Sequence, residues 1–503
     1  MTVSCTDLAD NTSEEVSVEP FTIDLTKPEI EICYDNNEAK HDLYYQKPRV
    51  AKITVKEHNF REEDFILTAE PEVSMSEWSH NGDEHWVQIT FAEDNHYCFT
   101  YTYADLAGNE ADVPQEQEFY IDSIPPQIVI HGVENESANA GEIHPIVTVY
   151  DRNHSKDEVN VTVTTGMGKS IPLTIQMQQE EQGYSYMLTD MSEKEDAIYY
   201  MTVSAQDMAG NQSELTYRFS LNRHGSTYDL TQISQITERV YNRSEQISDL
   251  CITEMNVDEI EEYSIYITRN GKMLDCQETQ KRPESNDKKE EVCYYVESAG
   301  NEQTGYTNRY IFYQENFSQE GNYRITCYSK DRAGNETNNT LEDKKAEVSF
   351  VVDNTAPKVM IDGIEPGGIY NEEAQTVHIM VQDNFCLNKA YFILVNEAGE
   401  ELQSWDYMEL AGEAGETVSI TIPSLEEKQS LLYCVSDAAG NETVLLPDSE
   451  ETPKGFLITT NPWLQFISSP IKVIGAICVM VGFLTAGAAF IYKKHSQKAK
   501  MTK

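Results

Sequence analysis

A short turn sequence recurs along the chain and constrains the fold more than any other feature. The sequence Asp-x-Ala-Gly-Asn begins at Asp105, Asp207, Asp331 and Asp437, and an altered copy, Asp-Leu-Ala-Asp-Asn, begins at Asp7. Successive copies are about 100 to 125 residues apart, which is the length of a small domain and exceeds the roughly 20 to 50 residues of a solenoid repeat. The chain is therefore predicted to be a series of similar domains.

A second motif keeps step with the turn. A strand-like Phe-x-[Ile/Val]-Asp sequence followed by proline begins at Phe21, Phe119 and Phe350, and an altered copy begins at Phe219. Proline lacks the N–H group that a β-ladder needs and holds the chain extended. This motif is therefore predicted to be the last strand of each domain and the linker to the next.

The residues before each turn alternate with a period of two. Aromatic or aliphatic residues alternate with Thr or Ser in residues 97–105, 199–207 and 323–331, as in half-buried strands. The Ala-Gly-Asn sequence that follows tolerates positive φ, so the chain can return as a β-hairpin. The predicted fold class is all-β: tandem immunoglobulin-like β-sandwiches, with the turn joining strands F and G, followed by one transmembrane helix.

Together the two motifs carry a resemblance to a known family. Tyr-x-[Val/Ile]-x-[Ala/Ser]-x-Asp-x-Ala-Gly-Asn followed by Phe-x-[Ile/Val]-Asp resembles the bacterial immunoglobulin-like repeats of surface proteins and large adhesins, over residues 1–447. The resemblance implies a structural or adhesive stalk that is not an enzyme and that binds an extracellular protein or glycan. A second hypothesis is that the chain anchors a larger surface glycosidase or protease, whose catalytic domain lies upstream.

The motifs also predict domain boundaries. Residue 1 enters directly into a hairpin, so the chain is interpreted as the C-terminal part of a longer surface protein. The third full domain is longer than the others, with an insertion at about 276–307, in which the Ser-Ala-Gly-Asn copy after Glu297 is expected to lie in a loop. The predicted parts are a domain remnant (1–23), four Ig-like domains (24–122, 123–222, 223–353 and 354–448), a linker (449–470), a transmembrane helix (471–492) and a basic cytoplasmic tail (493–503).

The C-terminal sequence indicates the compartment. Residues 473–492 are 20 uncharged residues, which at about 1.5 Å per residue span a hydrocarbon core of about 30 Å. Five lysines follow, at Lys493, Lys494, Lys498, Lys500 and Lys503. The positive-inside rule therefore predicts a single-pass membrane protein with its repeats outside the cell and its tail in the cytoplasm. The alternative is a buried core helix.

Charge excludes one class of partner. The chain has 37 Lys and Arg against 86 Asp and Glu, a formal net charge of −49. Nucleic-acid binding needs a cationic surface and is therefore not expected. The acidity either keeps the domains soluble or binds cations.

Three acidic positions are expected to converge beside each turn. In an immunoglobulin sandwich the B–C and F–G loops share one pole, so the turn Asp should approach the residue that closes strand B and the linker Asp. Clustered carboxylates repel one another without a cation, and hard oxygen ligands suit calcium, which adhesin repeats of this kind use to stiffen their joints. The alternative is that these residues are ordinary turn formers. The predicted calcium ligands are Asp24, Glu57 and Asp105 in the first full domain, Asp122, Asp151 and Asp207 in the second, and Asp353, Asp383 and Asp437 in the fourth.

The third domain departs from this pattern. It has Asn222 in the linker and Met255-Asn256 where the acid should be, so its turn is expected to lack a cation.

Cysteine and histidine give further hypotheses. An oxidising exterior permits disulfides, and Cys251 with Cys327 could join strands B and F while Cys276 and Cys293 close the insertion; the alternative is buried free thiols. A group of histidines, with Asn81-Gly82 reading as a hairpin turn, could also bind zinc. The group consists of His80, His85 and His96. The sequence contains none of the common catalytic motifs, such as Gly-x-Ser-x-Gly or His-Glu-x-x-His.

Overall fold

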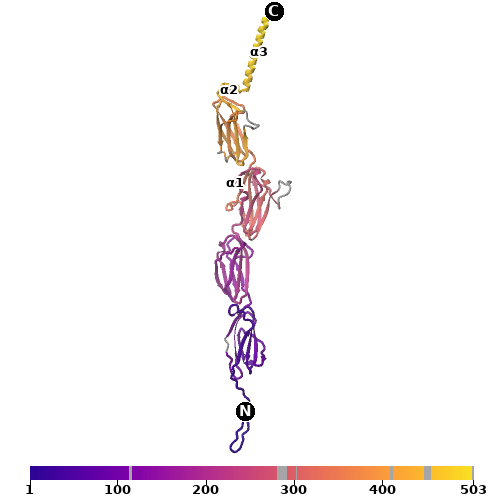
Figure 1. The fold of residues 1–503 in the computed structure, drawn as a ribbon, viewed down its shortest axis with the longest axis vertical. Coiled ribbons are helices and arrows are strands. Elements are labelled where there is room, and N and C mark those ends of the chain that lie inside the picture. Colours follow the sequence, from indigo (N-terminus) through magenta and orange to yellow (C-terminus); the bar gives the residue numbers. More distant parts are fainter. Residues whose placement is uncertain are drawn as a thin grey trace. The chain divides into compact units, whose positions relative to one another are not determined.

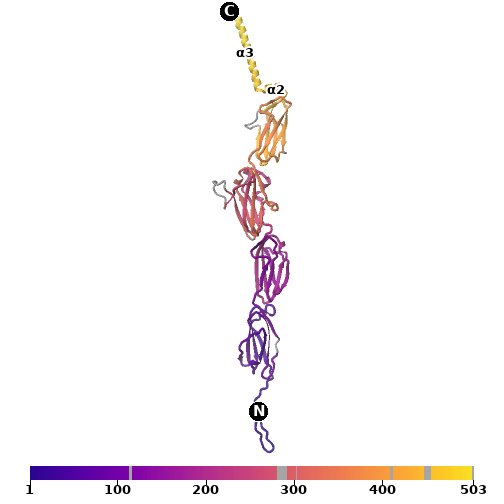
Figure 2. The ribbon, with the colours of Figure 1, turned by 180° about the vertical axis from the view of Figure 1, so that it is seen from behind.

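The computed structural model describes residues 1–112, 116–279, 292–301, 303–407, 410, 412–446 and 455–500. Strands gather into pairs of facing sheets, and helix α3 follows the last pair (Figure 1); Figure 2 shows the same ribbon from behind. The chain forms two compact units. The first consists of Met1–His224, Asn301–Gly305 and Arg332–Asn335, and the second of Gly225–Gly300, Tyr306–Asp331 and Glu336–Lys503.

The first unit begins with a two-stranded hairpin and a sandwich. The hairpin pairs β1 (Thr2–Val3) with β2 (Val16–Ser17). One sheet of the first sandwich contains β3 (Glu29–Tyr34), β5 (Arg49–Lys56), β9 (Glu84–Phe91), β7 (Ser74–Met75) and β8 (Ser79–Asn81). The other contains β4 (Tyr44–Tyr45), β11 (Gln117–Ile121), β10 (Asn95–Tyr103) and β6 (Phe65–Glu70).

The second sandwich has two four-stranded sheets. One contains β12 (Gln127–His131), β14 (Ile146–Tyr150), β17 (Gly183–Leu188) and β16 (Ile175–Glu180). The other contains β13 (Ser137–Asn139), β19 (Gln212–Leu221), β18 (Ala197–Asp207) and β15 (His154–Thr165). The tight hairpin β18–β19 confirms the predicted F–G turn.

The third sandwich carries the insertion. One sheet contains β20 (Thr227–Asp229), β22 (Leu250–Asn256), β27 (Gly305–Phe312), β26 (Val292–Asn301) and β25 (Gln277–Thr279). The other contains β21 (Tyr241–Asn242), β30 (Val348–Val352), β28 (Gly321–Asp331), β23 (Ile260–Arg269), β24 (Lys272–Met273) and β29 (Glu336–Asn338). A short helix, α1 (Ser234–Arg239), precedes β21. The loop predicted around Glu297 is wrong, because these residues belong to β26, which extends the sheet beyond β27.

The fourth sandwich corrects a predicted boundary. Its smaller sheet contains β31 (Lys358–Asp362), β33 (Ala374–Gln382) and β36 (Gly415–Pro423). The larger contains β32 (Ile369–Tyr370), β39 (Phe456–Ile458), β37 (Lys428–Asp437), β34 (Leu387–Asn396), β35 (Glu401–Tyr407) and β38 (Glu442–Leu445). Residues 449–470 are therefore not only a linker, because β39 pairs with both β37 and β32. Phe456 and Ile458 are buried in the core of this sandwich.

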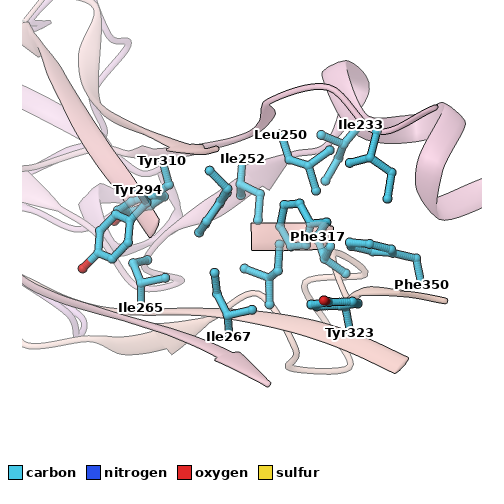
Figure 3. Packing of buried hydrophobic residues seen from close by; sticks show 14 of the residues in the cluster. Ile233, Leu250, Ile252, Ile265, Ile267, Tyr294, Tyr310, Phe317, Tyr323 and Phe350 are labelled. Atoms are coloured by element: carbon cyan, nitrogen blue, oxygen red, sulfur yellow. The ribbon is translucent and has the colours of Figure 1, made fainter. Parts of the chain in front are cut away.

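Each core lies between two facing sheets. In the third sandwich the rings of Tyr323, Phe317 and Phe350 contact one another at one end of the core, while Tyr294 and Tyr310 lie at the other end (Figure 3). The ring centroid of Tyr323 lies 5.3 Å from that of Phe317 and 5.6 Å from that of Phe350. These are favourable edge-to-face and stacked separations. Along β28, Tyr323, Ile325 and Cys327 are buried in this core, as the alternation in residues 323–331 predicts.

One predicted disulfide is wrong. Cys251 and Cys327 are buried free thiols. Neighbouring residues in a strand point to opposite faces, and Leu250 and Ile252 face the core. Cys251 therefore points away from the core in which Cys327 packs. Cys276 is disulfide-bonded, and the side chain of Cys293, its predicted partner, lies outside the described residues.

Two helices end the chain. Helix α2 (Pro462–Ile467) is capped by Asn461, whose side chain accepts a hydrogen bond from the Trp463 N–H. Helix α3 (Pro470–Lys500) contains one segment long and apolar enough to cross a membrane, Pro470–Ile491. No part of that segment is buried against the described protein, which argues against the core-helix alternative.

Candidate metal centre

The repeated turn has one conformation in all four domains. Its glycine has φ of 85° to 88° at Gly108, Gly210, Gly334 and Gly440, a left-handed region that favours glycine because it lacks Cβ. In three of the turns the Asp side chain accepts hydrogen bonds from the backbone N–H and side-chain amide of the turn Asn. The turn Asp is therefore fixed at the end of strand F.

The turn Asn also holds the linker from the preceding strand. Asn109 Nδ2 donates to the carbonyl oxygen of Asp24 at 3.2 Å, Asn211 to that of Asp122 at 2.8 Å and Asn441 to that of Asp353 at 3.0 Å. One amide thus contacts both the turn carboxylate and the linker backbone. The Asn at the end of the motif therefore holds the linker against the sandwich that follows it.

The structure brings together the three carboxylates of every predicted set. In each set one oxygen atom from each residue lies within 4.8 Å of the other two. The sets are Asp24, Glu57 and Asp105; Asp122, Asp151 and Asp207; and Asp353, Asp383 and Asp437. We call them the first, second and fourth acidic sites.

In the first acidic site Glu57 and Asp105 are buried and Asp24 is partly exposed. Glu57 accepts a hydrogen bond from the Asn59 N–H at 2.8 Å, and Asn59 Nδ2 lies 3.5 Å from Asp24 Oδ2. Burial raises the pKa of Asp105, but hydrogen bonds from Asn109 and from other N–H groups of the turn outweigh it and hold the pKa below its ordinary value.

In the second acidic site two carboxyl groups have raised pKa values, unlike Asp105 in the first. The pKa of Asp151 is raised to about 6, chiefly by burial and also by the negative charges of Asp122 and Asp207. The pKa of Asp207 is also raised, chiefly by burial. Asn153 Nδ2 donates to Asp122 Oδ2 at 2.6 Å, which satisfies one oxygen of the site. A cleft of about 550 Å³, lined in part by Asp122, Asp151 and Asn153, gives solvent access.

The fourth acidic site has carboxylate oxygens without partners. Asp353 Oδ2 and Asp383 Oδ1 are buried and accept no hydrogen bond from any described residue. Asp353 is fully buried. Its pKa is raised to about 6, chiefly by burial and also by the charges of Asp383 and Asp437, while a hydrogen bond from the Thr355 N–H limits the rise. Leaving such oxygens unsatisfied is costly, so the donor set fits a bound cation.

These donors match the chemistry of calcium. Calcium takes six to eight hard oxygen ligands from carboxylates, carbonyls and water in flexible geometry. Each acidic site offers three carboxylates, among which burial and mutual repulsion disfavour the charged form in the second and fourth sites. A divalent cation would relieve this repulsion.

The third turn replaces the acid by an amide. Asn256 closes β22, and its Nδ2 donates to Asp331 Oδ2 at 3.1 Å and to Ser226 Oγ at 2.9 Å. Among the described residues, no set of three carboxylates forms at the third turn. At this turn one oxygen of Asp331 accepts a hydrogen bond from the Asn256 side chain, and the expectation that the third turn binds no cation stays a prediction.

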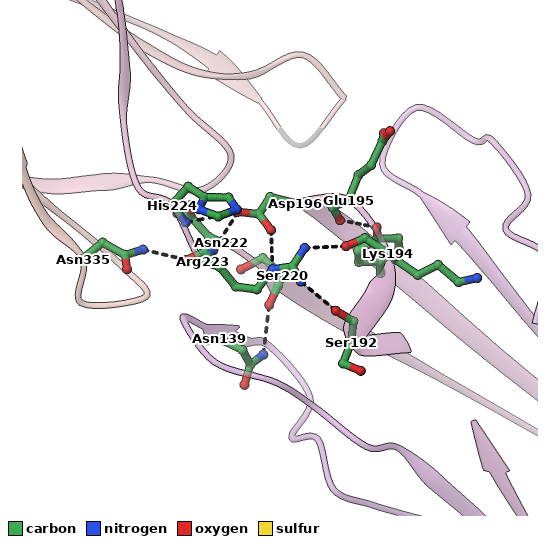
Figure 4. Close-up of polar contacts among 11 residues, drawn as sticks. Asn139, Ser192, Lys194, Glu195, Asp196, Ser220, Asn222, Arg223, His224 and Asn335 are labelled. Atoms are coloured by element: carbon green, nitrogen blue, oxygen red, sulfur yellow. Dashed lines mark hydrogen bonds and ion pairs between the residues drawn. The ribbon is translucent and has the colours of Figure 1, made fainter. Parts of the chain in front are cut away.

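The third turn keeps the contact to its linker. Asn335 Nδ2 donates to the Asn222 carbonyl oxygen at 2.6 Å (Figure 4). The next residue, Arg223, is anchored by Asp196 Oδ1 at 2.8 Å and by the carbonyl oxygens of Ser192 and Lys194. Here an arginine network positions the linker.

The histidine group does not form as predicted. Asn81-Gly82 does make a hairpin turn between β8 and β9, and His80 and His85 lie together with their Nδ1 atoms 2.8 Å apart. His96 lies instead on β10, in the other sheet, beside Cys98 and Glu118. Sequence reasoning missed this group because Glu118 comes from a different strand, although strand alternation places Cys98 on the same face as His96.

Comparison with known proteins agrees with the fold. An all-β chain of successive sandwiches, with acidic sites where linkers meet turns, defines a tandem immunoglobulin-like protein. Residues 88–224 match the profile of the bacterial Ig-like domain (group 3) family, which confirms the predicted resemblance over that part of the chain. No curated protein matches the sequence.

Three of the solved structures that match the chain share little sequence identity with it. One is a tetra-tandem repeat in the extending region of a large adhesion protein, with 11% identity, a TM-score of 0.33, and coverage of 83% of this chain and 97% of that chain. Another is the Yersinia pseudotuberculosis adhesin InvE, with 8% identity, a TM-score of 0.23, and coverage of 64% and 97%. A third is domains 5–6 of the S-layer protein SbsC, with 14% identity, a TM-score of 0.13, and coverage of 38% and 98%.

Proposed function

We propose that the chain is a cell-surface stalk of tandem immunoglobulin-like domains, anchored by α3, whose joints are stiffened by calcium at the three acidic sites. Its role is structural and adhesive rather than catalytic. The family match over residues 88–224 and the apolar segment Pro470–Ile491 support this role. The ligand would be an extracellular protein or glycan, as for the surface repeats that the sequence resembles.

One observation carries the calcium proposal. In every acidic site the linker Asp contributes a side-chain oxygen to the site and a backbone carbonyl to the turn Asn. A cation bound there contacts the linker and two loops of the following sandwich together. It therefore removes freedom from the linker, as a stalk that transmits force or holds a binding surface away from the cell requires.

The second acidic site allows a direct test. A fragment of residues 27–222 contains this site complete and lacks Asp24 of the first. At millimolar concentrations calcium exceeds the dissociation constants of extracellular calcium modules several-fold, so stability should rise by about 1 to 2 kcal/mol, or roughly 3 to 6 °C in Tm. A chelator should reverse the gain, and the small-angle scattering profile should change with it.

Matched variants identify the ligands. Asp151→Asn keeps the shape of the side chain but removes a charged ligand, and should abolish the calcium gain. Asp157→Asn, at an exposed position on β15, should retain it. Calcium that shifts neither Tm nor the scattering profile of the unmodified fragment would mean that these residues form turns alone.

A further inference from the structure

The outer face of the first sandwich carries a second kind of ligand set. On β10 the side chains of residues 97, 99, 101 and 103 are buried, so His96 and Cys98 point to the opposite face. Glu118 on β11 is directly opposite Cys98 in the antiparallel register. One ligand atom of each of His96, Cys98 and Glu118 lies within 4.8 Å of the other two.

The histidine is already held in place. Its ring stacks on Tyr120, with centroids 4.1 Å apart and planes 7° apart, and Tyr120 in turn stacks on Tyr44. His96 Nε2 lies 2.8 Å from Glu118 Oε1. A ring fixed by stacking and by a carboxylate loses little freedom when it binds a ligand.

The thiol has acidic neighbours on both sides. Cys98 pairs with Glu118 on one side and with Glu70 of β6 on the other. A dipositive metal ion would offset this negative potential and stabilise the thiolate.

We propose that His96, Cys98 and Glu118 form a site for a divalent transition-metal ion of the zinc type. The combination of imidazole, thiolate and carboxylate favours a borderline-soft ion such as Zn²⁺ or Co²⁺ over calcium. Metal binding releases the thiol proton to solvent and forms bonds to the thiolate, to one imidazole nitrogen and to one carboxylate oxygen. Because the site is on an exposed face, water completes the coordination.

The test uses the full chain in detergent, with its thiols reduced and transition metals removed. Excess calcium is added so that the acidic sites do not bind the cobalt or zinc. Cobalt should bind with one equivalent per chain and give the near-ultraviolet absorption band of a thiolate-to-cobalt charge transfer, and zinc should abolish the band by displacement. Cys98→Ser should remove the band. His96→Gln and Glu118→Gln should each weaken zinc binding by about tenfold or more.

The control is Cys33→Ser, which removes an exposed thiol from β3 in the same sandwich. This variant should keep the band and the zinc affinity. The proposal is overturned if the unmodified chain gives no thiolate band, if Cys33→Ser removes the band, or if zinc affinity is unchanged in Cys98→Ser and His96→Gln. Circular dichroism of each variant checks that the surface substitutions leave the fold intact.

Discussion

Asp353 gives a residue-scale test because its side chain is fully buried and its pKa is raised in the folded chain. The folded pKa is about 6, against an ordinary value of 3.8. The folded state therefore binds this proton more tightly, and the stabilisation is full below about pH 3.8 and is lost as pH rises through about 6. In chelator, the unmodified protein should lose about 1 to 2 kcal/mol from this carboxyl over that window, after allowance for solvent screening.

Asp353→Asn should remove that loss, so that the variant is the more stable protein at pH 7.5 without cation. Denaturant titration of the fourth domain at pH 4 and pH 7.5 measures the difference. Asp362→Asn, which changes an exposed carboxylate at the end of β31, is the matched control and should follow the unmodified protein. A difference between Asp353→Asn and the unmodified protein that stays constant with pH would contradict the assignment.

The acidic sites were predictable residue by residue, and the transition-metal site was not. Every acidic ligand has a fixed place relative to the repeated turn, so the immunoglobulin topology alone brings Asp207 to Asp122 and Asp151. The group around His96 depends on which residue of β11 pairs with Cys98. That register is set by the packing of whole strands and has no local motif.

At the scale of elements, β39 was missed in the sequence because one residue departs from the linker motif. Residues 456–462 resemble the linker motif, Phe-x-Ile followed by proline, but Thr459 stands where three other linkers have Asp and one has Asn222. The predicted domain therefore ended at residue 448, before its last strand. The pattern of Phe456, Ile458 and Pro462 was the signal that could have found it.

This correction predicts different behaviour for two fragments. Residues 354–461 should unfold in one cooperative transition, whereas residues 354–448 lack β39 and should not, because the core loses Phe456 and Ile458. In the longer fragment Phe456→Ala should cost about 3 to 5 kcal/mol. Val444→Ala on β38, where the side chain is 40% exposed, should cost far less. A cooperative transition in the 354–448 fragment, measured by denaturant titration, would show that β39 is dispensable.

At the scale of the whole molecule, the proposed orientation rests on charge asymmetry about α3. The chain before the apolar segment carries all 86 acidic residues, whereas five lysines follow it. A short basic flank is retained in the cytoplasm during insertion, and acidic domains translocate without this barrier. With an epitope tag after Lys503, protease added to intact cells should remove the sandwiches and leave a tagged fragment that contains α3. Permeabilised cells should lose the tag, and replacing the five lysines by glutamate should reduce its protection, whereas loss of the tag from intact cells would contradict the orientation.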